Sequence, residues 1–365
     1  MRTEICRRLN IEYPILAFSH CRDVVAAVTR AGGMGVFGAQ RYTPEELDIE
    51  LTWLDENTDG GRYGVDVLIP ASRTEGDLGA LKAQIPAEVT EYVDKLLAEF
   101  GLPNEPVKLT TYGGITATHN QARDLLEVAF THADRVAFIA SALGPAPADV
   151  RDRAHGFGMQ VMGMAGSVRH ATKQAEAGTD IIVAVGTEAA GHTGDISTMV
   201  LVPDIVDAVP GIPVVAAGGI GGGRQLAAAL ALGAEGVWCG SVWMTTVESE
   251  VDPIVRDMLI AATAGDTVRS KFTSGKPVRF LRTPWNEAWL RPGAPAALPM
   301  PLQGLAVQNA METMKQNRRF ELLGTAAGQV IGRLNKVTTS RDVVNQMAVE
   351  LADTVERLSR LADED

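Results

Sequence analysis

Short apolar runs alternate with segments of helical spacing eight times along the N-terminal part of this 365-residue chain. An apolar run bounded by turn residues is typical of a strand buried in a parallel sheet, and a helix must then return the chain to the same edge. The predicted strands are residues 14–19, 34–39, 63–70, 135–141, 159–165, 181–185, 213–217 and 236–240, and helices are predicted at residues 22–31, 44–53, 119–131, 148–155, 168–177 and 222–232. Eight such units favour an α/β fold of the (β/α)8 TIM barrel type.

An open doubly wound sheet with a separate helical domain is the alternative architecture. A dinucleotide-binding version of that fold needs G-x-G-x-x-G spacing after its first strand, and the loop after residues 14–19 lacks this spacing. The barrel is therefore the preferred prediction.

The regular alternation breaks in two places, which suggests a domain plan. Residues 71–106 carry helical patterns and prolines without a clear strand, so we predict an insertion at the ligand-binding end of a barrel formed by residues 1–245. Residues 246–315 are predicted to form a lid region, with an irregular stretch at 270–301. Residues 316–365 are predicted to be helices that pack back on the barrel.

Charge and cysteine content exclude several classes of protein. The formal net charge of −12 argues against binding to nucleic acid or to an anionic membrane. No apolar run reaches the roughly 18 residues of a spanning helix, and the first residues lack the apolar core of a secretory signal. Cys6, Cys21 and Cys239 are too widely spaced for a metal-ligand pair and do not form a disulfide framework. We expect a cytoplasmic protein without a metal site, and a homo-oligomer is compatible with the sequence.

One histidine lies among small residues directly after the sixth predicted strand. The run 181–185 stops at Gly186, and His192 follows, with the acid Glu188 four residues before it. Ligands bind at the carboxyl ends of barrel strands, and a histidine there can exchange protons near neutral pH. His192 is therefore the predicted catalytic residue, with a structural role in the loop as the alternative. Glu188 is predicted to orient His192 or a backbone amide, or else to be solvent-exposed.

The other histidines carry weaker signals. His20 follows the first predicted strand at the ligand-binding end, so it is either a substrate contact or the start of a surface helix. The remaining four fall on predicted helices or at their ends and are expected on the surface: His119, His132, His155 and His170.

Two glycine clusters follow the last two predicted strands. Gly218 and Gly219 follow residues 213–217, and Gly240 and Ser241 end the next strand. Glycine lets backbone N–H groups approach an anion closely, and barrels frequently hold a cofactor phosphate between these two loops. The pair of clusters favours a phosphate site over ordinary turns. Cys239, inside the second loop, is expected to pack as a small apolar side chain rather than act as a nucleophile.

The segment 269–282 contains five cations and no acid, namely Arg269, Lys271, Lys276, Arg279 and Arg282. A run of like charges is usually a solvated face. The alternative is a lid that attracts a phosphate-bearing substrate such as an acyl-CoA, with Trp285 and Trp289 as its apolar wall.

Several motifs appear together in one order: a Pro-Ile strand at residue 14, AGGMG at 31–35, GVD at 64–66, GTEAAGH at 186–192, AGGI at 217–220 and GAEGVWCGS at 233–241. In this order they resemble the nitronate monooxygenase family (2-nitropropane dioxygenases) of FMN-dependent barrels. That family also includes flavin-dependent enoyl-thioester reductases.

The resemblance implies that FMN lies across the strand ends with its phosphate at Gly219, Gly240 and Ser241, and that His192 faces the substrate side of the flavin. The cofactor-binding positions that it implies are Ala17, Phe18, Ser19, Asp66, Val185, Ala190, Gly191, Gly218, Gly219, Cys239, Gly240 and Ser241. Several of these depart from the family's usual residues: Ala190 replaces a glycine, Val185 a common glutamine and Asp66 a frequent asparagine. The N-terminal loop also departs, because residues 16–20 read LAFSH where the family has Gln-Ala-Pro-Met.

The resemblance also implies an enzyme, an FMN-dependent oxidoreductase that oxidises alkyl nitronates with O2. The alternative within the fold is an NAD(P)H-dependent flavin reductase of an enoyl or related acyl-CoA thioester. A barrel that binds flavin or another phosphate ligand without turnover is the alternative from a different class, but it would leave His192 without a purpose.

Overall fold

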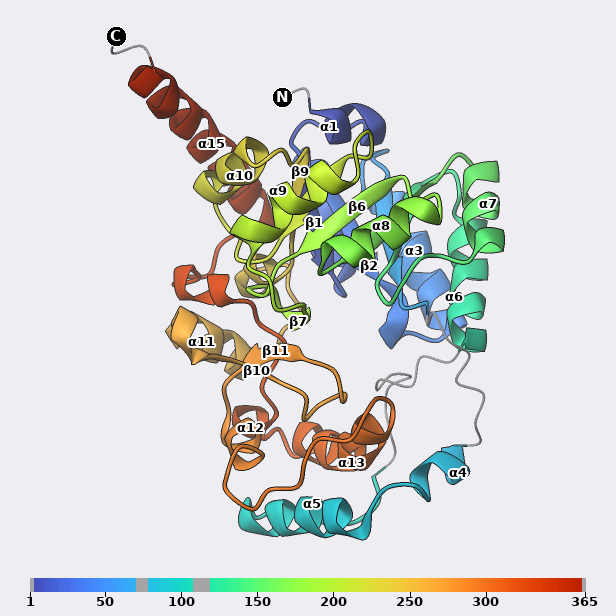
Figure 1. The fold of residues 1–365 in the computed structure, drawn as a ribbon, viewed down its shortest axis with the longest axis vertical. Coiled ribbons are helices and arrows are strands. Elements are labelled where there is room, and N and C mark those ends of the chain that lie inside the picture. The colour runs from blue at the N-terminus through green and yellow to red at the C-terminus, as the bar shows by residue number, and fades with distance from the viewer. Residues whose placement is uncertain (1–2, 70–77, 108–118, 363–365) are drawn as a thin grey trace.

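The predicted strands form a closed parallel barrel in the computed structural model (Figure 1), which describes residues 3–69, 78–107 and 119–362. The barrel closes where β1 pairs with β9, with Ile15 opposite Val237 and Ala17 opposite Cys239. The predicted (β/α)8 fold is therefore confirmed. Its strands are β1 (Ile15–Ser19), β2 (Met34–Gly38), β3 (Tyr63–Val67), β4 (Val136–Ser141), β5 (Gln160–Ala165), β6 (Ile181–Val185), β8 (Val214–Ala217) and β9 (Gly236–Cys239).

Alternate residues of each strand face the barrel interior or the surrounding helices. Leu16, Phe138 and Val183 belong to one buried cluster inside the barrel, and Ile15 and Ala17 belong to another cluster between strands and helices. The interior is filled with side chains, so a ligand has room only at the ends of the strands.

Helices surround the barrel and cover one of its ends. Ile5 and Leu9 of α1 pack with interior residues, so α1 covers the amino-terminal end of the strands. Thr43 and Glu46 form a capping box at the start of α3, with Pro44 at the first helical position, as the sequence suggests. These helices are α1 (Glu4–Leu9), α2 (Arg22–Arg30), α3 (Pro44–Asn57), α6 (His119–Thr131), α7 (Ala148–Gly156), α8 (Val168–Glu176), α9 (Thr198–Ala208) and α10 (Gly223–Ala231).

The helix α9 is not among those predicted above. Pro203 lies inside it and interrupts the pattern that a sequence reading relies on, because proline lacks the N–H of the helical ladder. With α9 in place, a helix follows β6 as it follows the other strands.

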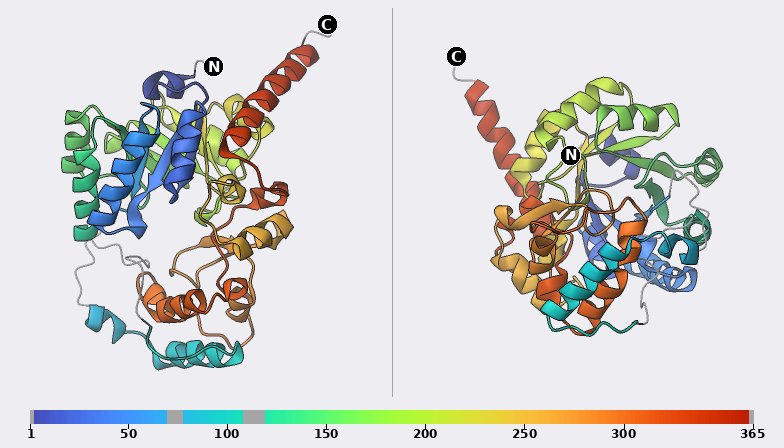
Figure 2. Two further views of the ribbon diagram at one scale, coloured as in Figure 1. Left: turned by 180° about the vertical axis from the view of Figure 1, so that it is seen from behind. Right: turned by 60° about the horizontal axis from the view of Figure 1, so that its bottom comes forward.

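Segments far apart in sequence form a helical cap on the side of the barrel away from α1 (Figures 1 and 2). Val93 and Leu97, from the predicted insertion, share a buried cluster with Trp285, Trp289 and residues of α13. The insertion thus packs with the lid region. The cap contains α4 (Leu78–Lys82), α5 (Ala87–Glu99), α12 (Pro284–Ala288), α13 (Leu302–Gln316) and α14 (Phe320–Leu323).

A three-stranded antiparallel sheet lies between the barrel and the cap. It contains β10 (Thr267–Ser270), β11 (Val278–Leu281) and the short β7 (Gly191–His192), in the order β10-β11-β7. The stretch predicted to be irregular therefore contains a strand, β11, because pairing with remote residues compensates for its weak local pattern.

The C-terminal helix α15 (Ser340–Ala362) packs against α10 and α2. The Glu350 carboxylate accepts a hydrogen bond of 2.7 Å from the backbone N–H of Gly223, at the start of α10, where the helix dipole favours an anion. The remaining helices are α11 (Pro253–Ala261) and the 3-10 helices η1 (Ala39–Arg41), η2 (Ser241–Thr245), η3 (Ala264–Asp266) and η4 (Gln329–Arg333). Among the described residues, no helix has the length and apolar character needed to span a membrane.

Candidate active site

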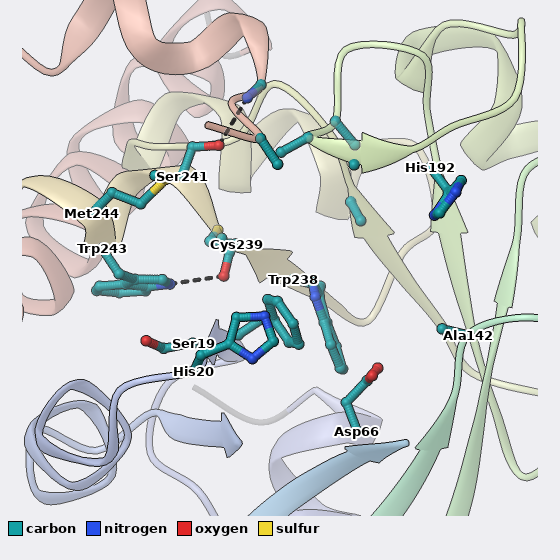
Figure 3. Close-up of a pocket in the computed structure, with 18 of the residues that line it drawn as sticks. Ser19, His20, Asp66, Ala142, His192, Trp238, Cys239, Ser241, Trp243 and Met244 are labelled. Atoms are coloured by element: carbon teal, nitrogen blue, oxygen red, sulfur yellow. Dashed lines mark hydrogen bonds between the residues drawn. The ribbon is translucent and has the colours of Figure 1, made fainter. Parts of the chain in front are cut away.

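A cavity of about 520 Å³ opens at the carboxyl ends of the barrel strands (Figure 3). Residues 325–330 contribute to its wall from the C-terminal part of the chain. The predicted site residues that line the cavity are Phe18, Ser19, Asp66, Val185, Ala190, Gly191, His192, Gly218, Gly219, Cys239, Gly240 and Ser241. The sequence therefore identified residues that fold into one cavity.

Ala17 is the predicted cofactor-binding residue that does not line the cavity. It is fully buried, and its side chain packs in the cluster between the barrel strands and the outer helices. The alternation of β1 turns Phe18, the next residue, toward the cavity, so only the backbone of Ala17 is left for the predicted cofactor contact.

His192 lies on β7, across the cavity from His20 and Trp238 (Figure 3). Its Nε2 is 3.0 Å from Ser274 Oγ. The Ser274 hydroxyl also lies 3.2 Å from the carbonyl oxygen of Lys276, to which it can donate. With that donation made, His192 donates its Nε2–H to Ser274 Oγ, and Nδ1 is left as the proton acceptor.

The electrostatic surroundings keep the His192 imidazole neutral. The His192 ring is partly solvent-exposed, but partial desolvation by the atoms packed around it lowers its pKa below the ordinary value, and the nearby positive charge of Lys276 lowers it further. A neutral imidazole at pH 7 can accept a proton from a bound molecule.

Glu188 does not contact His192. Its carboxylate accepts hydrogen bonds from the backbone N–H of Thr198, at 2.9 Å, and from the Thr198 hydroxyl, at 2.8 Å. Thr198 begins α9, so Glu188 binds the positive end of that helix and fixes the loop between β6 and α9. Of the roles predicted for Glu188, orienting a backbone amide is the one that the structure supports.

The two glycine clusters meet at one corner of the cavity. Gly218 and Gly219 adopt φ angles of 114° and 69°, which side chains other than glycine rarely adopt. The Ser241 hydroxyl accepts a 2.9 Å hydrogen bond from the backbone N–H of Gly328, so the C-terminal segment is attached to this corner. A Cβ added to Gly240 would meet nothing nearer than Phe18, at 3.9 Å, so this glycine faces open space.

Cys239 is buried in this corner, and burial raises the pKa of its thiol to about 12. Its carbonyl oxygen accepts a 2.7 Å hydrogen bond from the Trp243 indole N–H. A thiol with this pKa is not a nucleophile at neutral pH, which agrees with the predicted packing role.

Asp66 is 2% exposed and points into the cavity from the end of β3 (Figure 3). Its carboxyl oxygens have no hydrogen-bond partner in the described part of the chain, and burial raises its pKa from 3.8 to about 7. A buried carboxyl without a partner is costly, so this side chain is available to a hydrogen-bonding group of a ligand.

His20 is held in one tautomer beside the end of β2. Its Nδ1 is 2.8 Å from the carbonyl oxygen of Gly38, to which it donates, so Nε2 is left as an acceptor. Burial lowers the pKa of His20 to about 3, with a contribution from the positive charge of Arg41. His20 lines the cavity as a neutral side chain and does not begin a surface helix.

Two cations of the basic segment 269–282 are engaged within the protein. Arg279 is buried and donates to the carbonyl oxygen of Thr187 and to the Thr267 hydroxyl, at 2.9 and 3.0 Å. Arg269 pairs with Asp195 at 2.6 Å. Trp285 and Trp289 are buried in the helical cap and do not line the cavity, so the alternative in which they form the apolar wall of a substrate lid gains no support.

Three of the remaining histidines have described side chains. His155 and His170 are exposed, as predicted. The His132 side chain is only 9% exposed, and its Nδ1 lies 2.7 Å from a carboxylate oxygen of Asp55, so the surface prediction for His132 is wrong. The side chain of His119 lies outside the described part of the structure.

Sequence reasoning missed three polar contributors to the site: Ser274, Gly328 and Arg41. Ser274 and Gly328 approach through contacts with residues 82 and 87 positions away, which no local pattern shows. Arg41 has a local signal that could have found it, because it follows the second predicted strand at the ligand-binding end.

Comparisons with known proteins agree with this geometry. Residues 6–350 match the sequence profile described as nitronate monooxygenase. A protein of Mycobacterium tuberculosis strain H37Rv that is described as a monooxygenase is 49% identical to this chain, and the alignment covers 99% of each chain.

Two solved structures resemble this one over nearly all of their length. Nitroalkane oxidase from Streptomyces ansochromogenes has a TM-score of 0.80 and 25% identity, with 95% of this chain and 98% of that chain covered. FabK from Thermotoga maritima has a TM-score of 0.72 and 26% identity, with 99% of each chain covered. The profile match extends over nearly the whole chain, so this protein belongs to the nitronate monooxygenase family of flavin-dependent barrel oxidoreductases.

Proposed function

We propose that the protein is an FMN-dependent oxidoreductase that oxidises alkyl nitronates with O2. The observation that carries this proposal is the neutral His192 facing a cavity whose other end is a glycine corner. Membership of the nitronate monooxygenase family is the ground for the flavin cofactor and for the class of reaction.

The cavity fits a flavin phosphate in the corner between β8 and β9. Gly240 leaves open space there, and the backbone near Gly218 and Gly219 can approach an anion closely. Asp66 provides a buried carboxyl without a hydrogen-bond partner. The polar edge of the flavin ring would supply one. Ser19, Val185, Ala190 and Gly191 would line the remaining wall. FMN carries a phosphate and no adenosine, which suits one glycine corner without a dinucleotide fingerprint.

When bound, the flavin would supply electron transfer between the substrate and O2. The residues of this chain position the substrate and move its proton. With a neutral nitroalkane, His192 Nδ1 would remove the proton from the carbon next to the nitro group, and Ser274 would hold the ring in place. A nitronate is already an anion, so His192 would orient it and stabilise its charge.

The alternative is NAD(P)H-dependent reduction of an enoyl or related acyl-CoA thioester. The structural similarity to FabK is the observation that favours this alternative. The cavity offers little support for a CoA-binding lid, because Arg269 and Arg279 of the basic segment are engaged within the protein.

Extraction of the cofactor and oxygen consumption test the proposal. We expect the purified protein to be yellow, to release FMN on denaturation, and to consume O2 with propyl nitronate. Release of FAD, or a protein that stays colourless after incubation with flavin, would contradict the FMN assignment. Normal FMN content without nitronate oxidation would leave the cofactor assignment standing and reject the reaction.

A further inference from the structure

Asp66 is an acid at the cavity end of an apolar barrel interior. The alternation of β3 turns Val65 and Val67 toward the outer helices, where they belong to one buried cluster. Gly64 and Asp66 therefore face inward, and a Cβ added to Gly64 would meet the Phe138 ring at 2.2 Å. The Asp66 carboxyl lies at the end of this apolar layer and points into the cavity (Figure 3).

Asp66 has no counter-ion among the residues that the structure describes. The strands that flank β3 are β2 and β4, and neither contributes a titratable side chain. On α6, which packs outside β3, the described titratable side chains are exposed, namely Arg123, Asp124 and Glu127. The other titratable side chains that line the cavity are His20, Cys21, Arg41, His192, Cys239 and Glu250. None of them opposes the effect of burial, which raises the pKa of Asp66 to about 7.

The protonation state of Asp66 decides which hydrogen bonds it can form. A protonated carboxyl donates through its O–H, whereas a carboxylate only accepts. The edge of a flavin ring carries several carbonyl oxygens and ring nitrogens that accept hydrogen bonds, and one N–H that donates. The asparagine that is frequent at this position in the family has an amide that donates at every pH. Asp66 can form the same hydrogen bond only while it holds its proton.

We propose that Asp66 binds the flavin ring as a neutral acid that donates a hydrogen bond, so that the protein loses affinity for its cofactor as this acid ionises. The inference rests on the proposed function, because it concerns the flavin of that reaction. An ionised Asp66 would hold a negative charge beside carbonyl oxygens in a poorly solvated site, which costs free energy. The affinity for FMN is therefore linked to pH through one side chain, and an asparagine variant lacks this link.

The dissociation constant of FMN tests the proposal on both sides of the titration. The FMN-loaded protein is equilibrated at a series of pH values from 6 to 8.5, and the free flavin is separated by ultrafiltration and measured by fluorescence. The variants are Asp66→Asn and, as the matched control, Glu250→Gln, which removes an exposed carboxylate from the wall of the same cavity. Dividing the wild-type constant by the Asp66→Asn constant cancels the titration of the FMN phosphate and of the remaining side chains.

We expect this ratio to rise about 30-fold from pH 6 to pH 8.5, because binding to a protonated group weakens about tenfold per pH unit above the pKa of that group, here about 7. Glu250→Gln should keep the wild-type dependence. Riboflavin lacks the phosphate and should show a rise of similar size with the wild type alone, so the test does not depend on how well one variant folds. A constant ratio, a ratio that falls as the pH rises, or a pH dependence that is lost in Glu250→Gln would overturn the proposal.

These binding measurements are independent of turnover, so the two proposals can fail separately. The predicted pH dependence without nitronate oxidation would support the role of Asp66 and reject the reaction. Nitronate oxidation by a protein whose FMN affinity does not depend on Asp66 would leave the proposed function standing and reject this inference. A protein that binds neither FMN nor riboflavin would contradict both.

Discussion

At the scale of single residues, the site depends on a histidine that is kept neutral and oriented. Partial desolvation and the positive charge of Lys276 lower the pKa of His192, so the neutral imidazole predominates at pH 7. Ser274 Oγ lies 3.0 Å from Nε2 and fixes the ring. Both partners lie in the segment 269–282, so Lys276 and Ser274 of that segment act on His192.

Replacing His192 with asparagine should retain the flavin and lower turnover of a neutral nitroalkane by roughly 10²-fold or more, because the general base is removed. The loss should be smaller for preformed nitronates, which need no deprotonation. Steady-state rates with nitropropane and propyl nitronate measure the difference. His170→Asn is the control, since His170 is exposed on α8. Unchanged rates with both substrates would assign His192 a structural role only.

Replacing Asp66 with asparagine should stabilise the flavin-free protein more at pH 8 than at pH 5. The pKa of Asp66 is about 7 in the folded protein and 3.8 as its ordinary value. As the pH rises between these values, the unfolded chain loses its proton first, so the wild type loses stability that the amide variant keeps. The loss stops above the folded pKa.

We expect the stability difference between Asp66→Asn and wild type to grow by on the order of 2–3 kcal/mol from pH 5 to pH 8. Urea unfolding at both pH values measures it, with Asp353→Asn on the exposed face of α15 as the control. An equal difference at the two pH values would mean that Asp66 is not a buried, unpaired acid.

At the scale of secondary-structure elements, the β10-β11-β7 sheet connects the catalytic loop to the cap. His192 pairs with Val278 across β7 and β11, so the position of the imidazole depends on the register of β11. Arg279 extends from β11 to the carbonyl oxygen of Thr187, in the loop that follows β6. The sheet therefore couples the order of the cap to the geometry of the site.

Arg279→Ala should destabilise the protein by about 2 kcal/mol, because the Thr187 carbonyl would lose its buried donor. Lys276→Ala should stay within about 0.5 kcal/mol of wild type, because Lys276 is exposed. Urea unfolding of the two variants compares a structural cation with a solvated one. Equal stabilities would mean that Arg279 behaves as another exposed charge.

Gly240→Val should lower FMN occupancy strongly while the protein still folds. The side chain would project into open space toward Phe18, and the negative φ of −120° at Gly240 avoids the left-handed strain that a side chain would meet at Gly219. Gly219→Val is a poorer test, because a φ of 69° would strain the loop whether or not a phosphate binds. Gly156→Val, at an exposed site with open space, is the control. The amount of flavin released per mole of protein measures the outcome. Full occupancy in Gly240→Val would mean that the phosphate does not bind at Gly240.

At the scale of the whole molecule, the barrel could be predicted because each strand and most of the surrounding helices carry their own local pattern, with α9 as an exception because of Pro203. His192 and the glycines of residues 218–240 could be predicted because they follow strands, and strand ends meet at one edge. The packing of α5 against Trp285 and Trp289 could not, because it joins segments nearly 200 residues apart that carry no shared pattern. The contact between Ser274 and His192 could not be predicted for the same reason, because the two residues are 82 positions apart. Whether a cation such as Arg279 is buried or solvated depends on its partners, which charge spacing alone does not reveal.

In the proposed reaction, a nitronate and not a nicotinamide nucleotide gives electrons to the bound flavin. Anaerobic rapid mixing of the purified protein with propyl nitronate, and separately with NADPH or NADH, tests it through the loss of flavin absorbance. We predict that propyl nitronate bleaches the flavin, that neither nucleotide does so at a comparable rate, and that admitting O2 restores the absorbance. Rapid bleaching by NADPH or NADH, with none by the nitronate, would contradict the account and establish the reductase alternative.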